Sequence, residues 1–338
     1  MHYIINIFIL VKFISVVFSD TCYARIDTYG EDRRENKNQL KIMEYNVEWM
    51  FIDYYESSDC PGDGCTWKNI THSTDHLNKV AGVINKFNPD IVNICEIEGD
   101  TEMNLLNDEL SSELKPYLIK GTDTSTGQNV GMLTKIDPVV DLFRTENKYN
   151  YPIEGSQCGY TGSGSTGVSK HYITLFNWND INVAYIGIHF LAYPDRTDRC
   201  AKREGQAKVI EQEIIKYTND GYEIVLIGDF NDYDNEIIDL NDDKPISHVL
   251  DILKGEQSSE FNLFNVNEKI DKDERYSNWW DKNDNCYSTM DEFVLIDHVL
   301  LSEKLYNMVS NVSIYHGYDE NCDRMNSDHY PIILDLNF

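Results

Sequence analysis

The chain has 338 residues, of which 41% are hydrophobic, enough to form the core of one large domain or two smaller ones. Its formal net charge is −29, from 29 Lys and Arg against 58 Asp and Glu. A charge of this size repels DNA and other polyanions unless metal ions or a local basic patch reverse the field, which argues against tight nonspecific binding of nucleic acid.

The N-terminus has the pattern of a secretory signal peptide. Residues 3–18 are almost all apolar, with Lys12 as the charged exception, and the small Ser19 follows them. An uncleaved membrane anchor is the alternative, but the apolar run is shorter than a bilayer span and contains Lys12. We therefore expect residues 1–19 to be a signal peptide, residues 20–39 to be a lead segment, and the protein to be secreted.

Eight cysteines agree with an oxidising compartment, although their connectivity cannot be deduced from spacing alone. Cys60 and Cys65 enclose a Pro-Gly-Asp-Gly turn, so a local disulfide is expected there. Cys158–Cys200 and Cys286–Cys322 are the other pairings that we expect. Cys95 lies in an apolar run and is expected to be a buried free thiol. Glycosylation sequons at Asn69 and Asn311 agree with secretion.

Short apolar runs alternate with helical stretches from about residue 40 to the C-terminus, which predicts an α/β or α+β domain. One helix has apolar residues at helical spacing from Leu77 to Phe87, and Pro89 stops it. A second helix covers residues 201–217. The expected strands, in chain order, are residues 40–47, 91–97, 172–178, 181–189, 223–228, 294–301 and 332–336.

A stretch rich in Gly and Ser, Gly155 to Ser169, contains the spacing of a dinucleotide-binding fingerprint at Gly162, Gly164 and Gly167. That fingerprint requires a strand before it and a helix after it. Here a loop precedes the glycines and a strand pattern follows them. We therefore interpret this stretch as a flexible surface loop.

Polar residues stand at the end of one expected strand after another, where a rigid element meets solvent. In chain order they are Asn46, Glu48, Glu96, His189, Asp229, Asn231, Asp297, His298, Asp328 and His329. Each alone has an ordinary explanation, such as a turn cap or a histidine packed in the core. The repetition favours one shared site.

These carboxylates, amides and histidines match the needs of phosphoester hydrolysis. The reaction requires charge to screen the phosphoryl oxygens, a base for water, and help for the leaving oxygen. Oxygen ligands suit Mg²⁺, with Ca²⁺ or Mn²⁺ as alternatives, whereas the cysteines are too scattered to indicate zinc. Histidine can supply a proton or positive charge near neutral pH.

The order of these motifs resembles the endonuclease/exonuclease/phosphatase superfamily, which includes pancreatic deoxyribonuclease, abasic-site endonucleases, neutral sphingomyelinases and inositol-polyphosphate phosphatases. The resemblance covers residues 40–338, which we expect to form one domain. Its most specific pieces are Gly228-Asp-Phe-Asn-Asp232 and Ser327-Asp-His-Tyr-Pro331, and weaker ones are Glu44-Tyr-Asn-Val-Glu48, Ile94-Cys-Glu-Ile97, Gly187-Ile-His-Phe190 and Ile296-Asp-His-Val299. It implies a four-layer sandwich of two packed mixed β-sheets flanked by helices, with a metal-centred cleft at the strand ends.

The resemblance also implies roles at the metal and the attacking water. Glu96 looks like the principal metal ligand, with Asn46 near the metal and the phosphate. Asp328 looks like a further acid of the metal site. Asp229 looks like the residue that orients or activates water, and Asn231 like its companion on the phosphate.

Further roles concern the histidines. His329 would stabilise the phosphoryl charge, with Asp297 orienting its imidazole. His189 matches a histidine that deoxyribonuclease-like and sphingomyelinase-like branches use as an acid or phosphate contact. Glu48 corresponds to an acidic ligand in only some members, and His298 is expected to pack against the sheet.

Substrate contacts are predicted at Lys170, Arg203 and Trp279. Arg203 belongs to a basic stretch, residues 196–208, which either contacts a phosphate backbone or forms a solvated helix start balanced by nearby acids. Trp279 forms the floor of the cleft or contacts substrate, and Trp280 alternates to the other face if this segment is a strand.

Four functions fit these observations. A secreted nuclease that cuts DNA or RNA is favoured by His189 and the basic stretch. A sphingomyelinase-type phospholipid hydrolase shares the metal site and must reach a phospholipid membrane, for which only Trp279 and Trp280 suggest a contact. A phosphate-monoester phosphatase is a third enzyme, and a non-catalytic binding module is the alternative of another class. No protein partner is evident.

Overall fold

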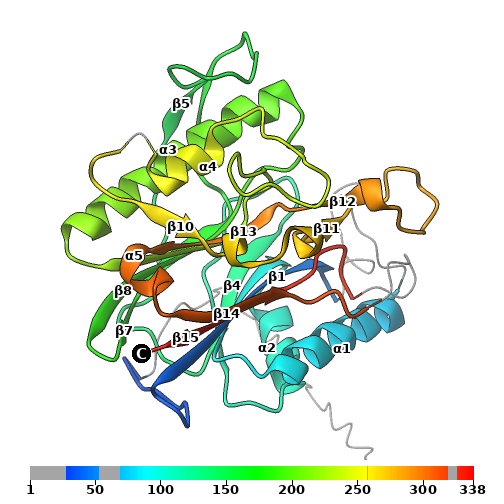
Figure 1. The fold of residues 1–338 in the computed structure, drawn as a ribbon. Coiled ribbons are helices and arrows are strands. Elements are labelled where there is room, and N and C mark those ends of the chain that lie inside the picture. The colour runs from blue at the N-terminus through cyan, green and yellow to red at the C-terminus, as the bar shows by residue number, and fades with distance from the viewer. Residues whose placement is uncertain (1–27, 53–68, 257, 319–325) are drawn as a thin grey trace, which may run out of the picture.

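Two β-sheets packed face to face form the centre of the protein (Figure 1). The computed structural model describes residues 28–52, 69–256, 258–318 and 326–338. The first sheet contains, in spatial order, β14 (Val309–Ile314), β15 (Ile332–Asn337), β1 (Gln39–Met50), β2 (Ile91–Ile97), β4 (Asn129–Thr134) and β3 (Lys115–Leu118). The second contains β10 (Leu263–Asn265), β13 (Asp297–Ser302), β9 (Glu223–Asp229), β8 (Ile181–His189) and β7 (His171–Trp178).

Helices cover the outer face of each sheet (Figure 1). The first sheet packs on α1 (Ile70–Phe87) and α2 (Asp100–Asp108), and the second on α3 (Thr197–Asn219) and α4 (Val249–Lys254). The short α5 (Glu303–Tyr306) follows β13, and the 3₁₀ turns are η1 (Val266–Lys269), η2 (Lys272–Glu274) and η3 (Met290–Glu292). This order of layers confirms the predicted four-layer sandwich.

Alternation along β1 explains how one strand serves two layers of the core. Leu40 and Ile42 belong to the apolar cluster between the sheets, whereas Tyr45 and Val47 belong to the cluster under α1 and α2. Asn46 shares the face of Leu40 and Ile42 by the same period of two. The strand therefore directs this polar residue toward the second sheet.

Local signals set the ends of α1. Asn69 caps its N-terminus, since its side chain accepts hydrogen bonds from the amides of Thr71 and His72 at 3.0 and 3.2 Å. Asn88 closes the C-terminus in the left-handed conformation, with φ 46°, and Pro89 prevents continuation. The predicted end of this helix is confirmed.

The expected strand 294–301 is interrupted. Phe293–Val294 forms β12, which pairs with β11 (Asn278–Trp279), and the chain re-enters a sheet only at Asp297. Between them, the hydroxyl of Ser277 accepts hydrogen bonds from the amides of Ile296 and Asp297, at 3.1 and 3.0 Å. These side-chain contacts replace strand pairing, which an apolar run does not reveal.

The stretch Gly155 to Ser169 is more ordered than a flexible loop. It contains β6 (Gly164–Thr166), which pairs with β5 (Tyr149–Tyr151), and this hairpin packs on α3. Gly205 of α3 permits the contact, because a Cβ there would lie 2.8 Å from Cγ2 of Thr166. The interpretation as a flexible surface loop is therefore corrected.

Two of the cysteine predictions are confirmed. Cys158 and Cys200 form a disulfide, and Cys95 is a buried free thiol. The pairings Cys60–Cys65 and Cys286–Cys322 involve residues outside the described part of the chain, as does the expected signal peptide. None of the described helices is both long and apolar enough to cross a membrane.

Candidate active site

Strand register in the second sheet brings three predicted residues together. His189 of β8 is paired with Asp229 of β9, and Asp229 is paired with Asp297 of β13. Gly228 allows the strands to approach, since it has φ 146° and a Cβ there would lie 1.9 Å from the carbonyl oxygen of Ile188. Strand packing therefore requires the glycine that precedes Asp229.

The first sheet contributes Asn46 and Glu96 from the opposite side of the cleft. The register of β1 and β2 shifts between Asn46 and Met50, and Glu96 has φ 67° in an irregularity of β2. Such bulges re-aim side chains at the ends of strands. The Asn46 amide donates to Oδ2 of Asp229 at 3.0 Å and to Oε1 of Glu96 at 3.3 Å, which links the two sheets.

The segment before β15 supplies the last two residues. Ser327 donates to the carbonyl of Asn46 at 2.8 Å, and the amide of Asp328 donates to Oε2 of Glu48 at 3.1 Å. These bonds hold His329 so that its Nδ1 lies 2.7 Å from Oδ2 of Asp297. Its Nε2 lies 3.9 Å from an oxygen of each of Asp229 and Asp328.

Buried carboxylates accumulate at this point and repel one another. Burial raises the pKa of Asp229 to about 8, and the charges of Asp297 and Glu96 act in the same direction. Burial likewise raises the pKa of Asp328 to about 6, and it holds the pKa of Glu48 well above its usual range with help from Asp328 and Glu96. A bound cation would relieve this repulsion.

The two histidines of the site are driven to opposite protonation states. Burial opposes protonation of His329, but the carboxylates of Asp297 and Asp328 outweigh it and raise its pKa well above the usual value. Burial lowers the pKa of His189 well below the usual value, and the positive charge of Lys170 adds to this effect. His329 is therefore the cationic partner and His189 the neutral one.

Most of the catalytic candidates border one open cleft of about 1480 Å³. The predicted residues that line it are Glu96, Lys170, His189, Asp229, Asn231, Asp328 and His329. Asn231, with φ 51°, donates its amide N–H to Oδ1 of Asp229 at 2.8 Å and its side chain to the carbonyl of Phe190 at 3.2 Å. Lys170 lies 3.3 Å from Nε2 of His189.

Comparison with known proteins agrees with this geometry. The model of the endonuclease/exonuclease/phosphatase family matches residues 66–329. The chain belongs to the endonuclease/exonuclease/phosphatase family. Members of this family are hydrolases that act on phosphoester bonds. No curated protein sequence matches the chain.

Solved structures share the fold of this family member at low sequence identity. An endonuclease/exonuclease/phosphatase family protein from Bacteroides thetaiotaomicron is 15% identical with TM-score 0.54, over 89% of this chain and 95% of that one. A humanized TDP2 from D. rerio is 14% identical with TM-score 0.52, over 89% and 100%. A mannosyl-6-phosphatase from Bacteroides thetaiotaomicron is 14% identical with TM-score 0.54, over 88% and 100%. These similarities show the fold alone.

Enzymes of the family generally depend on divalent metals, and the acids of this chain fit such an ion. Ligand atoms of Glu96, His189 and Asp229 all lie within 4.8 Å of one another. A second group of this kind, Asp229 with Asp297 and His329, is less suitable because His329 is bound to Asp297. Nδ1 of His189 and Oδ1 of Asp297 are buried without a hydrogen-bond partner among the described residues.

Asn46 forms hydrogen bonds through both atoms of its amide group. Its Oδ1 accepts a hydrogen bond from the amide of Glu48 at 3.1 Å, and its Nδ2 faces the carboxylates of Glu96 and Asp229. In this orientation the Asn46 side chain links two acids of the site. His189, predicted as a catalytic group, is the third member of the group of ligand atoms that includes Glu96 and Asp229.

Arg203 does not line the cleft, which contradicts its predicted contact with substrate. The side chain is fully buried, and its Nε lies 2.9 Å from Oδ2 of Asp232. Its other nitrogens donate to the carbonyls of Leu191, Tyr193 and Pro194 at 2.9–3.0 Å. Arg203 thus fastens the 191–194 wall of the cleft to the residue that follows Asn231.

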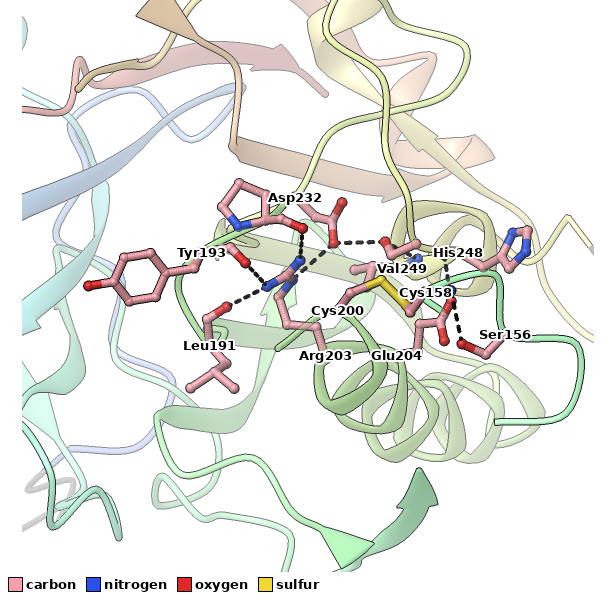
Figure 2. Close-up of a disulfide and its surroundings, with 12 residues drawn as sticks. Ser156, Cys158, Leu191, Tyr193, Cys200, Arg203, Glu204, Asp232, His248 and Val249 are labelled. Carbon is pink, nitrogen blue, oxygen red and sulfur yellow. Dashed lines mark hydrogen bonds and ion pairs between the residues drawn. A yellow bond between two sulfur atoms is a disulfide. The ribbon is translucent and has the colours of Figure 1, made fainter. Parts of the chain in front are cut away.

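The sequence contains a signal for the burial of Arg203. Ala207, Ile210 and Ile214 follow Arg203 at helical spacing and are all buried, so Arg203 lies on the apolar face of α3. The disulfide of Cys200 lies beside it and ties the loop before β6 to the first turn of the same helix (Figure 2).

Trp279 is also misassigned as a substrate contact. It is 2% exposed, and its indole N–H donates to Oε2 of Glu292 at 3.1 Å. Trp280 is 61% exposed and lines the cleft. The predicted alternation of the two side chains is correct, but the face that meets the cleft is the other one. His298 packs in the core as predicted, with its Nε2 2.9 Å from the carbonyl of Asp232.

Proposed function

We propose that this chain is a divalent-metal-dependent phosphodiesterase that cleaves DNA or RNA. The observation that carries the proposal is the placement of Asp229 between two histidines, with His189 Nε2 at 3.4 Å and His329 Nε2 at 3.9 Å from its Oδ2. A carboxylate so placed can orient the attacking water while an imidazolium faces the same point in the cleft.

In this proposal each residue of the site has a separate role. Glu96, Asp229 and His189 would hold the metal, which supplies positive charge to phosphoryl oxygens and lowers the pKa of water when bound. Asp297 keeps the His329 ring in orientation through its 2.7 Å contact with Nδ1. Protonated His329 then stabilises charge on the phosphate and can donate its Nε2 proton to the leaving oxygen.

Further support for a polymeric substrate comes from the form of the cleft. It is open, and it extends from the catalytic acids past Lys170 to basic and aromatic side chains contributed by residues 144–151 and 193–202. We also propose that the protein is secreted, which the apolar N-terminus and the disulfide between Cys158 and Cys200 support.

A substrate panel tests the proposal. The purified full chain is incubated with plasmid DNA, RNA, sphingomyelin and p-nitrophenyl phosphate, in Mg²⁺, Ca²⁺, Mn²⁺ or excess EDTA, beside an Asp229→Asn variant. We expect the wild-type protein to cleave DNA or RNA with metal and to be inactive in EDTA. Cleavage of sphingomyelin alone, or of the monoester alone, would contradict the nuclease assignment.

A further inference from the structure

One part of the cleft lies away from the catalytic acids and is lined by residues from within 122–126, 144–148, 165–169 and 193–202; we call it the arm. It contains cationic side chains that have no ion-pair partner in the described part of the chain. Three cationic residues of the arm form no ion pair with a described carboxylate. They are Arg144, Lys148 and Lys202, and all three line the cleft. In a chain with a net charge of −29, a group of cations without ion-pair partners is a candidate binding site for an anionic ligand.

Arg144 is held in a fixed position. Its Nη2 donates to the carbonyls of Val168 and Ser169 at 2.8 and 3.1 Å and lies 3.4 Å from the hydroxyl of Thr122. Its Nε is buried with no hydrogen-bond partner in the described residues. Burial lowers the pKa of this guanidinium, and Glu146 alone acts against that effect. The charge is therefore both oriented and poorly compensated.

Lys148 approaches the adjoining strip of backbone, residues 166–169, and Lys202 precedes a residue of α3 that also approaches it. Cγ of Lys148 lies 3.7 Å from the position of a Cβ on Gly167. Lys202 lies one turn before Gln206, whose side chain approaches the carbonyl of Gly167 at 3.5 Å. The strip 166–169 continues directly into Lys170, which contacts His189, so the arm opens onto the catalytic groups.

Acids also line the arm, but none of them forms an ion pair with Arg144, Lys148 or Lys202 in the described part of the chain. Oδ1 of Asp123 accepts hydrogen bonds from the amides of Ser125 and Thr126, and Asp198 is bound to Arg196 at 3.2 Å. The remaining acidic side chains that line the arm, Glu146 and Asp195, form no ion pair with Arg144, Lys148 or Lys202 in the described structure.

Exposed aromatic rings border the same cleft. Tyr193 is 54% exposed and Trp280 is 61% exposed, although both are large hydrophobic residues. The guanidinium groups of Arg196 and Arg199 each lie 5.8 Å from the Tyr193 ring centre. Aromatic platforms beside a cationic groove are the usual means of holding single-stranded nucleic acid, because unpaired bases can stack while the backbone meets the cations.

We propose that Arg144, Lys148 and Lys202 form a second phosphate subsite, which holds a single-stranded substrate by a phosphate remote from the one that is cut. The proposal rests on the proposed nuclease function and adds to it the class of substrate. Phosphate contacts of this kind fix the position of a strand without reading its bases.

The test compares substrates with one phosphate and with several. Hydrolysis of thymidylyl-thymidine and of an eight-nucleotide oligothymidylate is measured for the wild type and for a Lys148→Ala/Lys202→Ala double variant. The matched control is Lys244→Ala/Lys304→Ala, which removes two exposed lysines outside the cleft. Arg144→Lys, which keeps the charge, and Arg144→Ala complete the set.

We expect the subsite double variant to raise KM for the octamer about tenfold, and to reduce the slope of log affinity against log salt by about one for each lysine removed. kcat/KM for thymidylyl-thymidine should remain within about twofold of wild type, since that substrate has one phosphate to offer. An octamer KM and salt slope equal to those of the control variant would overturn the proposal.

A measurement of oligonucleotide binding tests the second phosphate subsite independently of the proposed nuclease function. Fluorescence anisotropy of a labelled, phosphorothioate octathymidylate reports affinity whether or not cleavage occurs. If the chain cleaves neither these substrates nor the RNA of the substrate panel, the nuclease function fails, and weaker binding by the subsite variant alone still supports the subsite. Preference for a duplex of the same length over the single strand would contradict the class of substrate proposed here.

Discussion

Oδ2 of Asp297 lies 2.7 Å from Nδ1 of His329, and the backbone of Asp297 is paired in register with Asp229. One residue therefore orients the imidazole and fixes its distance from the acid on the neighbouring strand. The pairing of β9 with β13 and the segment before β15 must both be in place for this contact to form. The geometry of the site is thus a consequence of sheet register.

Replacement of Asp297 by Asn should reduce turnover while the fold is retained. Asn is close in shape but cannot hold His329 in its charged form, so we expect kcat to fall by about 10²-fold or more with a smaller change in KM. Steady-state kinetics on a DNA or RNA substrate checks this. His329→Ala should act similarly, and His72→Ala, at an exposed position of α1, should have near-normal rates. Near-normal turnover of Asp297→Asn would argue against the orienting role.

Replacement of Arg203 by Ala should affect stability far more than charge-dependent binding. The change leaves the carboxylate of Asp232 buried without its partner, and we expect the free energy of unfolding to fall by about 3–5 kcal/mol. Denaturant unfolding measures this, and Lys208→Ala on the same helix should change it by less than about 0.5 kcal/mol. A change in the salt slope of DNA binding with stability unaffected would restore Arg203 as a phosphate contact.

Removal of the disulfide between Cys158 and Cys200 by a double replacement with Ser should also destabilise the protein. The two cysteines are 42 residues apart in sequence, so the cross-link constrains a long loop of the unfolded chain, worth about 2–4 kcal/mol. Thermal or denaturant unfolding with and without reductant tests this. We expect reductant to lower the stability of the wild type more than that of the double variant, and equal effects would contradict it.

Acid should weaken the contact between Asp137 and the lead segment. Burial disfavours the charge of Asp137, but hydrogen bonds from Arg33, Thr28 and Lys115 outweigh it and lower its pKa from 3.8 to about 2. Because the folded-state pKa is depressed, the stabilisation is fully present above about pH 4 and is lost as pH falls toward 2. Allowing for solvent screening it amounts to about 1–2 kcal/mol.

The comparison of wild type with Asp137→Asn isolates this effect. The difference in their free energies of unfolding should be largest above about pH 4 and should shrink as pH falls. A difference that stays constant between pH 5 and 2 would mean that the carboxylate of Asp137 is not preferentially charged in the folded protein.

Much of the site could be predicted because its residues follow strands whose apolar alternation is regular. His189 and Asp229 end β8 and β9, Asp297 begins β13, and the parallel and antiparallel register places these three strand ends together. The prediction that Arg203 contacts substrate rests on the charge of its basic stretch and is wrong, because the helical spacing of Arg203 with Ala207 places it on the buried face of α3.

Other features depend on tertiary contacts that no local pattern contains. β11 has only two residues, so the pairing with β12 decides which of Trp279 and Trp280 meets the cleft. Arg144 lies in a loop without periodicity, and its place in the cleft depends on carbonyl oxygens of residues 168 and 169. The amide orientation of Asn46 likewise follows from acids on two other strands.

The central claim is that the acids around Asp229 support metal-dependent cleavage of a phosphodiester. Its most direct test is the initial rate of oligonucleotide hydrolysis as a function of Mg²⁺ concentration, for the wild type and for Glu96→Gln. We predict that EDTA abolishes wild-type activity, that Mg²⁺ restores it, and that Glu96→Gln requires at least about tenfold more Mg²⁺ for its half-maximal rate. Wild-type hydrolysis that continues unchanged in EDTA would contradict the account.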